Sequence, residues 1–199
     1  TITEFLNDTG IEKIGNGAIV IDRYGRTNIP NVYSAGDCAT IYHSVLDKNV
    51  YIALATTANK MGRLIGENLA GAEKKFIGTL GSAAVKVLEF EAARTGITEA
   101  EAIENKINYK TVFVEGEDHS AYYPGEESVY LKLIYEADTK VLLGAQACGK
   151  KGVALRIDAL AVAIQNKMKT YELANMDFLY APPFATTWDI MNVAGNVAK

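Results

Sequence analysis

Hydrophobic residues recur with a helical period in the first half of the chain. Apolar side chains stand at positions 54, 58, 61, 64, 65 and 69, and this spacing places them on one face of a helix. We expect the helix to lie within residues 51–70 and to begin between Ala53 and Thr57. Upstream of it, residues 17–22 and 31–34 are short apolar runs next to turn residues. They predict two strands, the second of them buried in a parallel sheet.

The second half of the chain shows the alternation typical of strands, followed by longer helical stretches. Strands are predicted over residues 83–90, 109–115, 128–135 and 141–147, and the last two fit a hairpin. A short helical turn is predicted over residues 91–94, and Thr98 with Glu101 forms a capping box that opens a helix. Further helices are predicted over residues 150–167, from residue 170, and over 188–197. Locally paired strands with helices on one face indicate an α+β layer.

The composition changes between residues 71 and 81, where glycine and charged residues gather. This mixture is typical of an exposed linker between domains. We therefore expect an α/β portion over residues 1–75 and a separate α+β domain over residues 76–199. The second domain should be an antiparallel sheet with helices on one face.

Composition and charge exclude several classes of protein. Hydrophobic residues make up 49% of the chain, which indicates a globular protein, and the net charge of -4 disfavours nucleic acid as a partner. No apolar run is long enough to cross a membrane, and the chain starts without a leader pattern, so we expect a cytoplasmic location and no membrane partner. Cys38 and Cys148 fit no metal-ligand spacing, and His43 and His119 are the only histidines. We expect no metal site and half-buried cysteines.

Gly36 and Asp37 follow directly after the predicted buried strand. A glycine lets the backbone come close to a ligand. A carboxylate at the carboxyl end of a strand can accept strong hydrogen bonds from the hydroxyls of a sugar or polyol. An ordinary turn started by an aspartate explains these residues equally well.

The start of the predicted helix, at Ala55, Thr56 and Thr57, is a second candidate site. The first amides of a helix have no partner inside it, and they carry the positive end of the helix dipole. They would stabilise an electron-rich ring or an anion. The alternative is a packing helix that binds nothing.

The stretch from Thr27 to Asp37 resembles the second FAD-binding motif of the pyridine nucleotide-disulfide oxidoreductases. The resemblance implies that Asp37 holds the ribitol chain of FAD. It also implies that the helix beginning at Ala55, Thr56 and Thr57 points its N-terminus at the flavin pyrimidine. Ala53 stands where many members of the family have proline. NAD(P)H is implied as the second cofactor, with its nicotinamide site outside this chain.

The second half resembles the dimerisation domain of the same family, so the expected partner is a second copy of the chain. Tyr122-Tyr123-Pro-Gly and the Tyr180-Ala-Pro-Pro-Phe segment are similar to the branch of coenzyme A-disulfide reductases and NAD(P)H sulfur reductases. The resemblance implies that Tyr180 and Tyr122, or Tyr123 in place of Tyr122, protonate a leaving thiolate in the partner chain's active site. The alternative is that these tyrosines are interface aromatics.

The chain carries no Gly-x-Gly-x-x-Gly fingerprint, and no cysteine at the place of the family's redox cysteine. We therefore interpret it as the C-terminal fragment of an FAD-dependent NAD(P)H:disulfide oxidoreductase acting on the small-molecule disulfide of coenzyme A. By itself the fragment is predicted to be inactive. NADH oxidase or polysulfide reductase activity of the same family, or a role as an inactive dimerisation module, are the alternatives.

Overall fold

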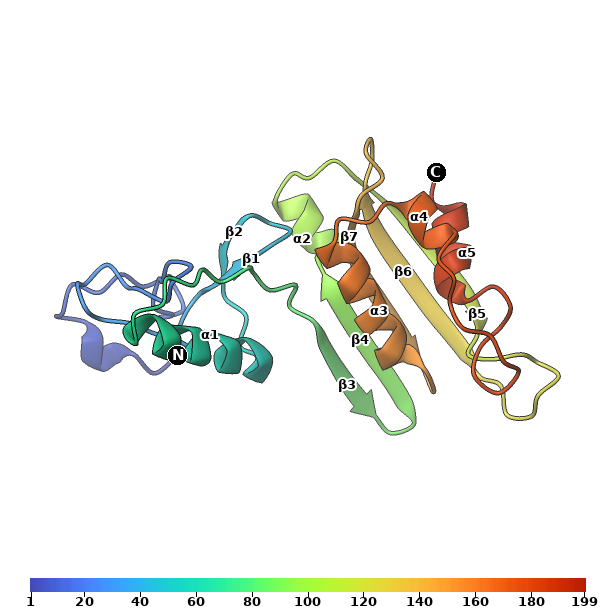
Figure 1. Cartoon of the computed structure of the whole chain (residues 1–199), viewed down its shortest axis with the longest axis horizontal. Helices are drawn as coiled ribbons and strands as arrows, with labels where there is room; N and C mark the ends of the chain where they lie inside the picture. Colours follow the sequence, from blue (N-terminus) through green and yellow to red (C-terminus); the bar gives the residue numbers. More distant parts are fainter. The chain divides into compact units, whose positions relative to one another are not determined.

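The chain folds into two compact units, which Figure 1 shows in a computed structural model describing all 199 residues. The first unit is Thr1–Gly81 and the second is Ser82–Lys199. The division falls at the end of the glycine-rich stretch, six residues beyond position 75. Each unit has its own core and is described by itself.

The first unit contains little regular structure apart from one long helix. Its elements are the 3-10 helix η1 (Glu4–Leu6), the short strands β1 (Ile41–His43) and β2 (Lys48–Val50), and the helix α1 (Ala55–Leu69). Strands β1 and β2 pair as an antiparallel hairpin. The core is small and gathers apolar residues from the loops, strand β1 and helix α1: Ile19, Ile21, Ala39, Ile41, Met61 and Phe76. The helix predicted from its spacing is confirmed, and it starts within the expected window.

The two strands predicted before this helix are wrong in detail. Residues 17–22 and 31–34 take part only in isolated bridges, which join Ile19 to Lys13 and Ala39, and Arg26 to Tyr33. The backbone of Asn31 is left-handed, with φ of 64°, so Pro30 and Asn31 form a turn that a strand cannot contain. The Thr27 amide donates to the Val32 carbonyl and closes this turn. Gly36 and Asp37 therefore follow a tight hairpin, and not a buried parallel strand.

The second unit is built on a five-stranded antiparallel sheet in the order β3-β4-β7-β6-β5. Its strands are β3 (Ala83–Val87), β4 (Phe90–Gly96), β5 (Tyr109–Glu117), β6 (Ser128–Glu136) and β7 (Leu142–Gly149). The predicted hairpin of the last two strands is confirmed. The helical turn predicted over residues 91–94 is wrong, because these residues belong to β4 and pair on both sides.

Helices cover one face of this sheet. They are α3 (Val153–Gln165) and α5 (Ile190–Val197), with α4 (Thr170–Ala174) packed against α5. The short helix α2 (Glu99–Glu104) lies apart from them, and its Glu99 bonds to Lys132 and Tyr109, whose side chains lie on the opposite face. Figure 1 shows α3 over β4 and β7, and α5 over β5 and β6. Alternate residues of β6, Val129, Leu131 and Leu133, are buried in the unit's core. The predicted antiparallel sheet with helices on one face is confirmed.

The opposite face of the sheet is open. Tyr130 pairs with Cys148 across β6 and β7 on this face, and Phe113 lies beside Lys132. Cys148 is exposed here, so the expectation that both cysteines are half-buried is wrong for this one. In neither unit does any helix combine the length and hydropathy that a bilayer crossing demands.

Candidate functional site

Gly36 lies against the first turn of helix α1. Its φ of 86° is in the left-handed region, which glycine adopts without strain. A Cβ atom at this position would stand 3.8 Å from the Cβ of Ala58. The structure thus brings the Gly36 turn and the start of α1 together, although they are separated by about twenty residues of sequence.

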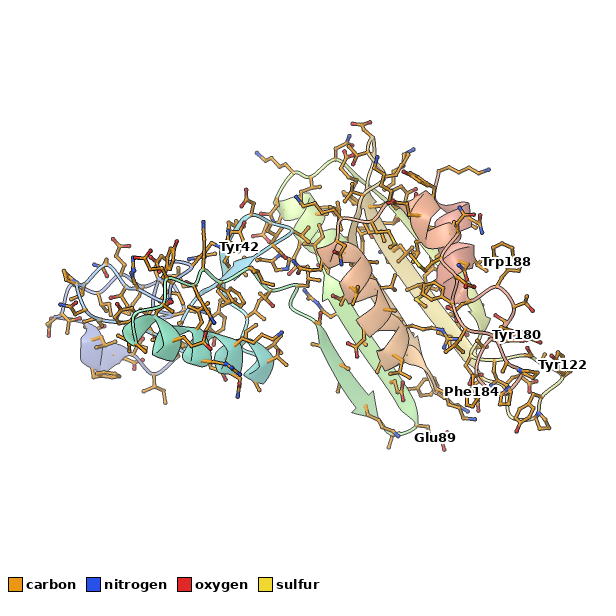
Figure 2. The ribbon with its side chains drawn as sticks, viewed as in Figure 1. Tyr42, Glu89, Tyr122, Tyr180, Phe184 and Trp188 are labelled. Carbon is orange, nitrogen blue, oxygen red and sulfur yellow. The ribbon has the colours of Figure 1, made fainter.

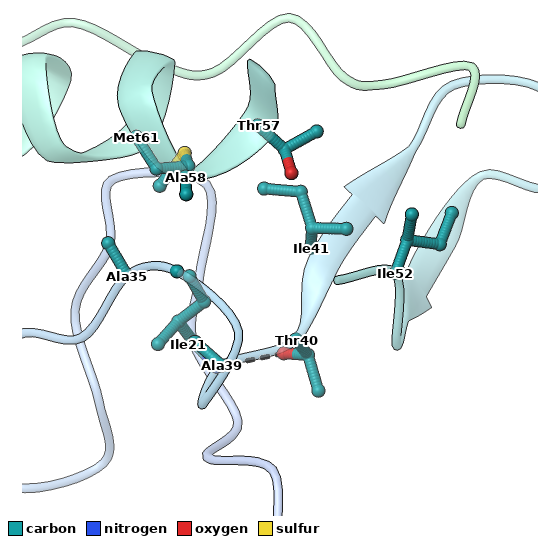
Figure 3. A pocket seen from close by; sticks show the side chains of 10 residues that line it. Ile21, Ala35, Ala39, Thr40, Ile41, Ile52, Thr57, Ala58 and Met61 are labelled. Carbon is teal, nitrogen blue, oxygen red and sulfur yellow. Dashed lines mark hydrogen bonds between the residues drawn. The ribbon is translucent and has the colours of Figure 1, made fainter. Parts of the chain in front are cut away.

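A small cavity lies between this turn and the helix, as Figure 3 shows. It measures about 10 Å³, enough for one water molecule and far too small for a coenzyme. Thr40 accepts a hydrogen bond from the Ile21 amide at its edge, with 3.2 Å between Oγ1 and N. The cavity lining is otherwise mostly apolar and comes from both elements: Ile21, Ala35, Gly36, Ala39, Thr40, Ile41, Ile52, Thr57, Ala58 and Met61. The gap belongs to the packing of the unit, and a coenzyme would have to lie outside it.

The start of α1 presents unused donors. Leu54 precedes the helix in an extended conformation, and no side chain caps the first turn. The Thr57 hydroxyl is buried and donates back to the Leu54 carbonyl at 2.8 Å, so it stabilises the helix end. Ala55 and Thr56 are exposed at this end. Their amides and the positive end of the dipole are open to an electron-rich ligand.

Asp37 is exposed, and its carboxylate makes no hydrogen bond or ion pair within the chain. It is free to accept hydroxyl groups, as the polyol chain of FAD would require. Three features match a flavin coenzyme. Asp37 can accept hydrogen bonds from its hydroxyls, the backbone at Gly36 can approach it closely, and the amides at the helix start can donate to its electron-rich ring. These residues fit one part of an FAD site.

The second candidate site joins two loops of the second unit. Tyr122 lies in the loop of residues 118–127 between β5 and β6, and Tyr180 lies in the connection of residues 175–189 between α4 and α5. Their hydroxyl oxygens are 2.5 Å apart. Figure 2 shows both tyrosines and Phe184 near one end of the sheet. Tyr122 is 73% exposed and Tyr180 is 46% exposed, so both phenols are open to a ligand or partner.

The two phenols differ in acidity because they share one hydrogen bond. The hydrogen bond with Tyr180 raises the pKa of Tyr122. The hydrogen bond with Tyr122, together with those to the hydroxyls of Ser120 and Thr187, lowers the pKa of Tyr180. Tyr180 is therefore the better proton donor of the pair.

Comparison with known protein families tests the resemblance found in the sequence. Residues 82–191 match the family described as pyridine nucleotide-disulphide oxidoreductase, dimerisation domain, and residues 1–62 match pyridine nucleotide-disulphide oxidoreductase. The chain belongs to the pyridine nucleotide-disulphide oxidoreductases. This confirms the family that the Gly36–Asp37 and Tyr122–Tyr180 segments resemble, and the second unit is its dimerisation domain.

Several relatives are sulfur reductases. The chain is 37% identical to the NAD(P)H sulfur oxidoreductase (CoA-dependent) of Pyrococcus furiosus, over 98% of the chain and 44% of that protein. It is 32% identical to the coenzyme A disulfide reductase of Staphylococcus aureus, over 99% of the chain and 45% of that protein. The solved structure of an NAD-dependent persulfide reductase from A. fulgidus superposes with a TM-score of 0.92 and 38% identity, covering 99% of the chain and 36% of its own. The chain thus spans less than half the length of these relatives.

Among the tyrosines of this oxidoreductase chain, the geometry pairs Tyr122 and not Tyr123 with Tyr180. The ring of Tyr123 meets the edge of His119, with 5.7 Å between ring centroids. Phe184 and Trp188 are exposed in the same connection as Tyr180, as interface aromatics are. The proton-donor role of Tyr122 and Tyr180 stays a prediction.

Sequence reasoning missed the buried polar groups beneath these loops. Arg156 and Asp189 form a buried ion pair, with 2.8 Å between Nη2 and Oδ2. Asp118 and His119 are also buried in contact, with 2.9 Å between Oδ2 and Nδ1. Asp189 also caps α5 through the Met191 amide, and an aspartate before an amphipathic helix was the one signal that could have found it.

Proposed function

We propose that the full-length protein carrying this chain is a homodimeric FAD-dependent NAD(P)H:disulfide oxidoreductase. Its proposed substrate is coenzyme A disulfide or a related sulfur compound of low molecular weight. Family membership and the names of the sulfur-reducing relatives support this proposal. The single observation that carries the mechanism is the contact of 2.5 Å between the hydroxyls of Tyr122 and Tyr180.

In this proposal the first unit contributes part of the coenzyme site. Bound FAD supplies the two-electron chemistry that protein side chains lack. Asp37 accepts hydrogen bonds from the polyol hydroxyls, and Gly36 allows the backbone to approach. The first amides of α1, at Ala55, Thr56 and Thr57, donate to the electron-rich edge of the ring.

The tyrosine pair supplies protons. Reduction of a disulfide by two electrons breaks the sulfur–sulfur bond and yields two thiolates, each of which takes one proton to become a thiol. Tyr180 donates a proton to the leaving thiolate, since its pKa is lowered. Tyr122 donates to the Tyr180 oxygen and so stabilises the phenolate that forms. Both tyrosines are exposed at an aromatic surface of the dimerisation domain, which suits their proposed entry into the partner chain's active site.

Tyrosine to phenylalanine variants of the full-length enzyme test this function. Tyr180→Phe should lower the turnover of coenzyme A disulfide by about 100-fold, the lower end of what a general acid contributes. Flavin content and the rate of flavin reduction by NAD(P)H should stay at wild-type values. Tyr171→Phe removes an exposed phenol on α4 and is the matched control. Wild-type turnover by Tyr180→Phe would remove the tyrosine from the mechanism.

An NADH oxidase is the second candidate, because the chain is also 36% identical to the NADH oxidase of Methanocaldococcus jannaschii over 94% of its length. Oxygen consumption measured beside disulfide reduction, with the same full-length enzyme, separates the two activities. The 199-residue chain alone should show neither activity, and its dimer should be visible by light scattering. A monomeric mass at high concentration would contradict the homodimer.

A further inference from the structure

The two loops that carry Tyr122 and Tyr180 are tied together below the surface by Arg156 of helix α3. Its side chain is 8% exposed and bonds to both loops. Nη2 donates to the Asp118 carbonyl at 2.8 Å, where the Tyr122 loop begins. Nε and Nη2 bind the carboxylate of Asp189, where the Tyr180 connection ends. Nη1 donates to the carbonyl of Gly152. This arginine therefore fixes one end of each loop against the same helix.

Asp118 closes the Tyr122 loop upon itself. Its amide donates to the Glu127 carbonyl at 2.9 Å, and its Oδ1 accepts the Glu127 amide at 2.7 Å. Its other oxygen, Oδ2, meets His119 Nδ1. The two ends of the loop are thus held one residue beyond β5 and one residue before β6.

Ser120 ties the Tyr122 loop to the Tyr180 segment. Its amide donates to the Pro182 carbonyl at 3.3 Å, and its hydroxyl donates to the Ala185 carbonyl at 3.2 Å. Its own carbonyl accepts the Tyr123 amide at 2.8 Å. Ser120, the next residue after His119, therefore sets the distance between the two loops.

Both ring nitrogens of His119 face acceptors. Nδ1 lies 2.9 Å from Asp118 Oδ2, and Nε2 lies 3.2 Å from the Tyr123 carbonyl oxygen. A neutral imidazole has one donor, so only the protonated ring can donate in both directions. The ring is 4% exposed, and solvent cannot replace a lost bond without opening the loop. Charged and titratable groups around it are Asp118, Lys151, Arg156 and the phenol of Tyr123.

The exposed phenols have little packing of their own to hold them 2.5 Å apart. Their contact depends on where the backbone of each loop lies, and the buried groups below hold that backbone. We propose that His119 is a positioning residue, which holds the loop of residues 118–127 so that Tyr122 meets Tyr180. Its effect on turnover rests on the proposed function of the tyrosine pair. A displacement of the order of 1 Å at a reacting group costs up to about 100-fold in rate.

The test uses full-length enzyme carrying His119→Gln, which keeps one donor and loses the other. Turnover of coenzyme A disulfide should fall about tenfold, since the tyrosine contact is loosened and not removed. Flavin reduction by NAD(P)H should be unchanged. In a Tyr122→Phe background the same substitution should cost nothing further, because the contact it positions is already gone. Wild-type enzyme should also lose turnover as the pH rises through deprotonation of His119, a limb that His119→Gln lacks.

Two further variants keep the result interpretable. Thr98→Ala breaks the capping box of α2, at the opposite end of the sheet in Figure 1, and controls for lost stability. It should leave turnover at the wild-type value. Ser120→Ala removes the hydroxyl bonds to Ala185 and to Tyr180 and leaves the backbone bonds of Ser120 in place, so it serves if His119→Gln fails to fold, and it should also slow turnover.

The outcomes separate the positioning role from the proposed function. Slow turnover by Tyr122→Phe with wild-type turnover by His119→Gln overturns the positioning role and leaves the function standing. An equal loss from His119→Gln with and without Tyr122 also overturns it, since the histidine would then act by another route. Wild-type turnover by Tyr122→Phe and Tyr180→Phe defeats both proposals.

Discussion

The two units differ in how much of their structure is paired within the unit. In the second unit every strand has a neighbour along its length, and the helices α3 and α5 cover one face. In the first unit the longest strand has three residues, and most of the pairing consists of isolated bridges. The first unit places a turn beside a helix end, whereas the second supports two loops on a buried ionic network. A ligand site can thus rest on loops, but the precise contact of Tyr122 with Tyr180 needs a rigid layer beneath it.

Breaking the ion pair of Arg156 with Asp189 should cause the largest loss in the free energy of unfolding. The loss should be confined to the second unit. Asp189→Asn leaves Arg156 without its charged partner inside the protein, which costs about 3–5 kcal/mol. Trp188 is the chain's only tryptophan and lies in this unit, so its fluorescence during urea unfolding measures the loss. Ile103→Ala, a change of an exposed residue on α2, is the control and should change the free energy of unfolding little. A wild-type midpoint for Asp189→Asn would show that the pair does not hold the loops.

A smaller loss in the free energy of unfolding is expected when a core residue of the first unit is truncated. Met61 is 1% exposed and packs from α1 into the small core. Met61→Ala should destabilise this unit by about 2–3 kcal/mol, the lower part of the range for such cavities, because loops can relax around the gap. Circular dichroism at 222 nm should report the loss of α1, and Trp188 fluorescence should not change. A shift of the Trp188 transition would mean that the units unfold together.

The pH dependence of the second unit should sharpen the comparison further. In this unit, the hydrogen bond with Asp118 raises the pKa of His119. Burial by itself would raise the pKa of Asp118, but the Glu127 amide and His119 lower it. A raised histidine pKa stabilises the folded state below the unfolded value of about 6.5, and this contribution is lost as the pH rises through the folded pKa. The lowered Asp118 pKa contributes above about pH 4, and is lost as the pH falls through its folded value.

Urea unfolding of the wild type and of His119→Gln from pH 5 to 9 measures this contribution. As the pH rises from about 6.5, the free energy of unfolding of the wild type should fall more steeply than that of the variant. Equal slopes in the two proteins would contradict a protonated, ion-paired His119.

Sequence alone could predict the elements whose signals are local. The spacing around Met61 predicted α1, and Thr98 with Glu101 predicted the start of α2 with its capping box. Strand β4 was missed because Ala92 and Arg94 face the open side of the sheet, where small and charged residues give no strand pattern. The strand predicted over residues 31–34 was wrong because Asn31 supplies a left-handed turn that overrides the apolar residues next to it.

The candidate sites also divide into residues with a local sequence signal and contacts that only the fold creates. Gly36, Asp37 and the start of α1 were predicted from short motifs, and the structure places Gly36 beside Ala58 in the first turn of that helix. The contact of Tyr122 with Tyr180 joins residues 58 positions apart, and only the fold distinguishes Tyr122 from Tyr123. Arg156 and Asp189 are 33 positions apart, and nothing in the spacing of single charges reveals a buried pair. Long-range polar contacts have no period, so a sequence pattern cannot display them.

The central claim is that Tyr180, held against Tyr122, gives its proton to a thiolate during disulfide reduction. The most direct measurement is a single turnover in which prereduced full-length enzyme is mixed with coenzyme A disulfide. We expect Tyr180→Phe to release coenzyme A thiol about 100-fold more slowly than the wild type, while Tyr171→Phe matches the wild type. Equal rates of thiol release in wild type and Tyr180→Phe would contradict the account.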